Sequence, residues 1–156
     1  MVAGPPLPQG DISVGRLADA LRLLDVDARR VVTAAHHEAY RYASHFLAST
    51  HLLLGLLAVD SAAATDTGLD DRILPESIRR RIELYMAPVR HPARPVHLPY
   101  TPHARAILIN AAALASQSAG PAAATPHHLW SALKGATGSL AARCLADVYG
   151  LPHDMR

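Results

Sequence analysis

The chain has 156 residues, a formal net charge of +2, 50% hydrophobic residues and only 4% aromatic residues. This length is enough for one domain with a sizeable core of Leu, Ala, Val and Ile. The small net charge gives no support to a nucleic-acid partner, and the single cysteine, Cys144, excludes an internal disulfide. Because the sequence shows no signal-peptide pattern and no apolar run that could span a bilayer, we expect a cytoplasmic protein without a membrane partner.

Helical periodicity dominates the first half of the chain. Residues 1–10 are rich in Pro and Gly and are predicted to be disordered. Apolar residues at helical spacing predict a first helix over Ile12–Leu24 and a second helix with Asp25 as its N-cap. A third helix is predicted to begin at the N-cap Ser49, and a further helix at Pro75.

Similar signals return in the second half. Residues 87–99 contain four prolines, which predict an extended linker. Helices are then predicted from the N-cap Thr101, from the pair Thr125-Pro126 and from the N-cap Ser139. No segment shows the alternation typical of a strand, so the predicted fold class is all-α.

The chain also contains an internal repeat. The segment Ala28–Leu57 aligns without a gap on Ala104–Leu133, at the constant offset of 76 residues that separates His51 from His127. Such a repeat predicts two copies of a small helical unit around a pseudo-twofold axis. One domain at residues 11–156 then contains a first repeat at about 24–86 and a second repeat at about 100–152.

Three stretches carry recognisable motifs. Ala48–Leu57 reads ASTHLLLGLL, Pro99–Arg105 reads PYTPHAR and Ser139–Leu145 reads SLAARCL. They resemble, in this order, the GTEHILLGLL signature, the hYTPRAK second-repeat opening and the GVAARVL stretch of the Clp N-terminal repeat domain. The resemblance covers about residues 24–152 at matching repeat spacing.

The resemblance implies a double repeat of a four-helix unit that recruits substrates or adaptors to Clp-type unfoldases. ClpC-type members also receive phosphorylated arginine side chains. This chain departs from the family by an additional helix at Ile12–Leu24 and by a truncated last helix. The family glutamate before the signature histidine is Thr50 in the first copy and Pro126 in the second, and the opening threonine is Asp25 in the first copy and Thr101 in the second. Because both guanidinium-binding carboxylates are missing, we do not expect phosphoarginine recognition in the family manner.

The resemblance places a candidate binding surface in the groove between the two repeats. Helix starts at Thr50 and Pro126 would present backbone N–H groups there, and the loss of both glutamates makes the groove less acidic and more apolar. The predicted binding residues are Asp25, Arg29, Thr50, His51, Thr101, Arg105, Pro126 and His127.

Other chemistry finds little support in the sequence. The chain has ten histidines but no HExxH motif, and Cys144 has no thiol companion, so no metal, cofactor or catalytic residue is predicted. His51 and His127 are interpreted as groups that order helix starts through hydrogen bonds.

Cys144 is predicted to be a buried apolar side chain. The run Arg79–Arg81 is interpreted as a solvated helix face rather than a nucleic-acid patch.

Three hypotheses about function follow. In the first, the chain is a free-standing Clp N-domain-like binding protein, since the printed sequence has no GxxxxGK[ST] phosphate loop. It would act as adaptor, regulator or decoy for Clp-dependent proteolysis, with Clp ATPase or protease components or client peptides as partners. In the second, it binds a hydrophobic small molecule in the inter-repeat groove, as a sequestering protein or a biosynthetic enzyme. The third is a DNA-associated regulator that uses the arginine run.

Overall fold

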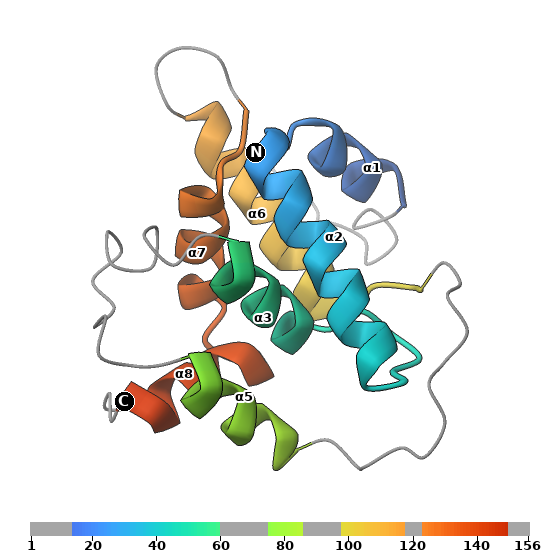
Figure 1. Cartoon of the computed structure of the whole chain (residues 1–156). Helices are drawn as coiled ribbons and strands as arrows, with labels where there is room; N and C mark the ends of the chain where they lie inside the picture. Colours follow the sequence, from blue (N-terminus) through green and yellow to red (C-terminus); the bar gives the residue numbers. More distant parts are fainter. Residues whose placement is uncertain (1–13, 60–74, 86–97, 118–122, 150–156) are drawn as a thin grey trace, which may run out of the picture.

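A computed structural model of the protein describes residues 14–59, 75–85, 98–117 and 123–149, and every regular element within them is a helix (Figure 1). This confirms the all-α prediction for the described part of the chain. None of the described helices is long and apolar enough to cross a membrane. The helices are α1 (Val14–Arg22), α2 (Val26–Arg41), α3 (Ser49–Val59), α5 (Pro75–Glu83), α6 (Pro102–Ser116), α7 (Pro126–Gly135) and α8 (Leu140–Tyr149).

Three predictions concern residues that the structure does not describe. The disorder of residues 1–10, most of the linker at 87–99 and the truncated last helix of the second repeat lie outside the described ranges. The predicted helix over Ile12–Leu24 is present as α1 within its described part, and it packs against α6.

Local signals set several helix starts as predicted. The Asp25 carboxylate accepts a hydrogen bond of 2.7 Å from the backbone N–H of Ala28, and the Thr101 hydroxyl accepts one of 3.2 Å from that of Ala104. The Ser139 hydroxyl accepts the corresponding bond at the start of α8. Each side chain satisfies a backbone donor that the first helical turn leaves without an intrahelical partner. Three of the predicted N-caps, Asp25, Thr101 and Ser139, are therefore confirmed.

Ser49 does not cap its own helix, contrary to prediction. It is buried in the first turn of α3, and its hydroxyl accepts a hydrogen bond of 3.2 Å from the backbone N–H of Ala141 in α8. The reason is tertiary: the start of α3 lies inside the protein, where the hydroxyl reaches a donor that is far away in sequence.

The core is built around α3. Every residue from Ser49 to Leu56 is buried, and α3 contacts α2, α5, α6, α7 and α8 (Figure 1). A helix that is apolar on all sides needs such complete cover. The closest approach is to α2, because a Cβ atom built on Gly55 would lie only 2.5 Å from the carbonyl oxygen of Val31. Glycine at this position lets the two backbones touch.

Two backbone pairings join the chain segments that precede these helices. The N–H of Leu47 donates to the carbonyl of Pro99, and the carbonyl of Leu47 accepts from the N–H of Thr101. The N–H of Ala124 likewise donates to the carbonyl of Leu23, and its carbonyl accepts from the N–H of Asp25. The segment before α3 therefore pairs with the segment before α6, and the segment before α7 pairs with the segment before α2.

These pairings correct the ungapped repeat alignment. Asp25 corresponds to Thr101 at the predicted offset of 76 residues, but Leu47 corresponds to Ala124 at an offset of 77. The offset changes because the connection from α6 to α7 is longer than the connection from α2 to α3. An alignment by residue identity cannot detect this change where two histidines, His127 and His128, stand side by side.

Candidate functional site

The first turns of α3 and α7 each contain a histidine that binds the chain just before the helix. The His51 Nδ1 atom accepts a hydrogen bond of 2.9 Å from the backbone N–H of Ala48, and the His128 Nδ1 atom accepts one of 3.0 Å from that of Thr125. This is the role that Glu or Gln plays at the third position of a capping box. The ordering role expected of His51 is present, whereas the counterpart of His51 is His128 and not the predicted His127, which is exposed.

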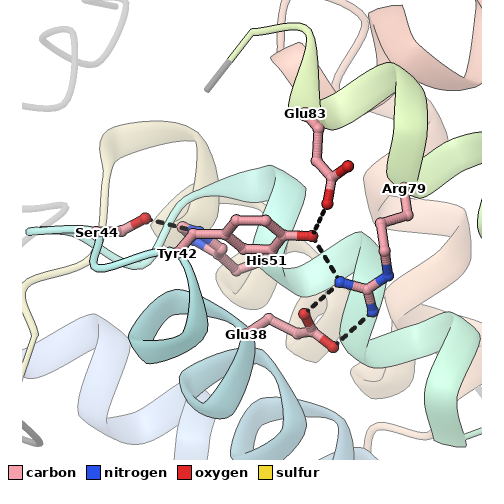
Figure 2. Close-up of polar contacts among 6 residues, drawn as sticks. All are labelled: Glu38, Tyr42, Ser44, His51, Arg79 and Glu83. Carbon is pink, nitrogen blue, oxygen red and sulfur yellow. Dashed lines mark hydrogen bonds and ion pairs between the residues drawn. The ribbon is translucent and has the colours of Figure 1, made fainter. Parts of the chain in front are cut away.

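Geometry determines the protonation of His51. Burial lowers the pKa of this imidazole to about 4, so the ring is neutral near pH 7. Because Nδ1 accepts the N–H of Ala48, the proton of the neutral ring is on Nε2, which donates to the Ser44 hydroxyl oxygen at 3.1 Å (Figure 2). A base must instead accept the proton of its nucleophile. The Ser44–His51 pair is therefore a structural contact and does not fit an activated nucleophile.

Several predicted groove residues are in the core. Thr50 and His51 are 1% and 2% exposed, and the side chain of Pro126 is also buried. These side chains do not line an accessible surface. Asp25 and Thr101 use their side chains as helix caps.

The arginine run on α5 is largely bound within the protein, which the sequence did not predict. Arg79 donates two hydrogen bonds of 2.8 Å to the two carboxylate oxygens of Glu38 on α2 (Figure 2). Arg81 donates one of 3.0 Å to Asp147 on α8. The interpretation of the whole run as a solvated face is wrong for Arg79, whereas Arg80 is exposed and the Arg81 side chain stays 41% accessible despite its ion pair. Long-range ion pairs of this kind leave no signal in the sequence.

A tyrosine extends the contact between α2 and α5. The Tyr42 hydroxyl accepts a hydrogen bond of 2.7 Å from Arg79 and donates one of 2.6 Å to Glu83 (Figure 2). The hydrogen bonds from Arg79 hold the pKa of the Glu38 carboxyl below its usual value. Partial burial raises the pKa of Tyr42, and the bond to Glu83 adds to this shift. Arg79 pairs with both oxygens of Glu38, and Tyr42 links this pair to Glu83, so the network acts as a clamp between α2 and α5.

Arg29 lies on an accessible surface that was not predicted from the sequence. A shallow depression of about 510 Å³ lies along the outer side of α2. Its lining residues recur at helical spacing on the side opposite the buried positions of this helix. That spacing is the signal that could have revealed the surface. We call it the α2 face, and its residues are Val26, Arg29, Arg30, Thr33, Ala34 and His37.

The described residues outside these contacts offer neither a reactive thiol nor a cluster of metal ligands. Cys144 is fully buried, as predicted, and burial raises the pKa of its thiol to about 11. A thiol of this kind is a poor nucleophile because little thiolate forms near pH 7. Within the described residues, no group of three or more His, Cys, Asp or Glu side chains could hold a metal ion. Arg105, the remaining predicted residue, is half-buried on α6.

The sequence matches no protein-family model, and no curated protein matches it significantly.

Proposed function

We propose that this chain is a binding module of the Clp N-terminal repeat type that acts as an adaptor, regulator or decoy in Clp-dependent proteolysis. The observation that supports the proposal most is the reciprocal backbone pairing between two helix pairs. The segments at Leu47 and Ala124 each pair with the start of the other helix pair through the same two hydrogen bonds. A pseudo-twofold double repeat of a four-helix unit requires such reciprocity.

The caps give the same support. Asp25 and Thr101 cap α2 and α6 with their side chains, and His51 and His128 bind the backbone before α3 and α7. Both helix pairs thus begin with the same two devices in the same order. Two of the sequence motifs that carry the resemblance, Ala48–Leu57 and Pro99–Arg105, contain the starts of α3 and α6.

The chemistry of the described site favours binding over catalysis. His51 donates to Ser44 instead of accepting from it. Burial raises the pKa of Cys144 to about 11. An arginine-bearing face on α2 is, by contrast, accessible to a partner.

A small molecule bound between the repeats is the less well supported alternative. That hypothesis requires an apolar groove between the repeats, lined at the helix starts by Thr50 and Pro126. Both side chains are buried in the protein, so a ligand there would have to displace core packing.

The proposal is tested by native mass spectrometry of the tagged protein, purified gently from its source cells. We expect assemblies whose added masses are those of Clp ATPase subunits or of peptides degraded by Clp. Purified Clp ATPase and peptidase should then degrade a fluorescent client at a rate that changes when the chain is added. The same degradation assay with a Clp ATPase that lacks its own N domain serves as the control. The absence of any Clp component or client would contradict the proposal, and a bound small mass without protein would favour the alternative.

A further inference from the structure

The α2 face carries two arginines together with the apolar side chains of Val26 and Ala34. Arg29, Arg30 and His37 are exposed, and Val26 is 65% exposed. Between them Ala34 is only half-buried. The six lining residues span Val26 to His37 on one helix, which is about three turns and about 17 Å. A surface of this length matches the contact made by one helix of a partner.

Both arginines keep donors for a partner. A guanidinium has about five N–H donors. Arg29 donates one bond of 3.3 Å to the carbonyl of Arg22 at the end of α1, and Arg30 donates one of 3.3 Å to Asp27. The Arg30–Asp27 pair is exposed, with side chains that are 69% and 57% accessible, so water screens it strongly. None of the described residues that line the depression is acidic.

We propose that the α2 face docks an acidic amphipathic helix of a partner protein. Apolar side chains of that helix contact Val26 and Ala34, and its flanking carboxylates bind Arg29 and Arg30. Acidic chemistry follows from charge complementarity with the two guanidinium groups. Small side chains at Thr33 and Ala34 allow the two helices to approach closely.

A nucleic acid fits this face less well. Val26 and Ala34 offer nothing to a phosphate backbone, and the described lining residues include no Tyr, Phe or Trp on which a base could stack. Only the identification of the partner as a Clp component or client rests on the proposed function. The chemistry of the surface stands independently of that assignment.

The test uses the folded, full-length chain labelled with ¹⁵N and two synthetic helical peptides of about 16 residues. Both peptides carry leucines along one stripe; one has glutamates beside the stripe and the other has lysines. With up to about 1 mM of the glutamate peptide, we expect shifts of the amide signals of Val26, Arg29, Thr33 and His37, and no such shifts with the lysine peptide.

Charge-reversal variants make the test specific. The double variant R29E/R30E should weaken binding of the glutamate peptide by about tenfold or more. R30E alone keeps the Arg29–Arg22 hydrogen bond and should give an intermediate loss. R80E/R143E makes the same change in net charge at two exposed arginines outside the face and should bind nearly as the parent protein does.

Three results would overturn the inference. The first is an absence of shifts on the α2 face with the glutamate peptide at the highest concentration. The second is equal binding by R29E/R30E and R80E/R143E. The third is stronger perturbation of the same amides by a short DNA duplex than by the peptide. None of these results affects the co-purification of Clp components, so a failure here is distinguishable from a failure of the proposed function.

Discussion

At the starts of α3 and α7 a histidine accepts the backbone N–H that precedes the helix, but the two histidines have different surroundings. His51 is 2% exposed and its neighbour Thr50 is 1% exposed. His128 is half-buried and its neighbour His127 is exposed. The shared hydrogen bond is a local device, whereas the burial that lowers the pKa of His51 comes from helices packed over α3. The comparison separates what a helix start does by itself from what its neighbours impose.

The largest expected effect concerns Gly55 and its counterpart Ala132, at the 77-residue offset. Gly55→Ala should destabilise the fold by about 3 kcal/mol, because the new methyl group must push α2 and α3 apart at the Val31 carbonyl. Ala132→Gly removes a buried methyl group without steric conflict and should cost roughly 1 kcal/mol. Urea unfolding followed by circular dichroism measures both. A loss for Gly55→Ala that is no larger than the loss for Ala132→Gly would contradict the tight approach of α2 to α3.

The second prediction uses pH to compare the two histidines. Since the pKa of His51 falls from 6.5 in the unfolded chain to about 4 in the fold, the unfolded state binds the proton more readily between these values. Stability therefore falls as the pH is lowered through this window, by about 2 kcal/mol between pH 7 and pH 4.5 for this one group. His51→Gln keeps an acceptor for the N–H of Ala48 and removes the titration.

The measurement is the free energy of unfolding as a function of pH. The stability curve of His51→Gln should be flatter than that of the parent protein above pH 4.5. His128→Gln should flatten it less, because the partly exposed ring loses less hydration. The Glu38 carboxyl, with its lowered pKa, adds its own loss of stability below about pH 4.5 and should not affect this window. Identical curves for the parent and His51→Gln would contradict the assigned burial effect.

The third prediction compares two ion pairs that hold α5. Arg79→Met removes two hydrogen bonds to Glu38, whose side chain is 12% exposed, and should cost about 1.5 kcal/mol. Arg81→Met removes a more exposed pair with Asp147 and should cost less. Arg80→Met is the matched control, since Arg80 is exposed, and should leave stability almost unchanged. Thermal unfolding of the three variants gives the order, and an effect of Arg80→Met as large as that of Arg79→Met would refute the clamp.

The smallest effects concern the two N-caps, where we expect no difference between the regions. Asp25→Ala and Thr101→Ala should each cost about 1 kcal/mol, because each removes one side-chain bond to a backbone donor in the first turn. Chemical denaturation of both variants under one set of conditions tests this. A several-fold larger loss for either variant would show that its cap also has a tertiary role.

Much of the fold was predictable because its signals are local. Asp25, Thr101 and Ser139 act on donors three residues away, and prolines at 75, 102 and 126 stand at helix starts as expected. Side-chain capping and the fixed φ of proline operate within one turn, so they are readable without the tertiary structure. The apolar spacing along α2 also matches its buried side.

The candidate site was less predictable, because its contacts join distant residues. Arg29 was identified, yet the surface around it became visible only once the other side of α2 was known to be buried. His128 could not be distinguished from His127, because the choice depends on the backbone pairing of Ala124.

The sequence by itself determined the helices and the caps at Asp25, Thr101 and Ser139, since propensity, capping and apolar spacing act over one or two turns. Only the tertiary structure decided which of these residues are accessible. It placed Thr50 in the core, joined the Ser49 hydroxyl to Ala141 and bound Arg79 to Glu38, 41 residues away. Burial and long-range pairing depend on which helices pack together, and no single segment of the chain contains that information.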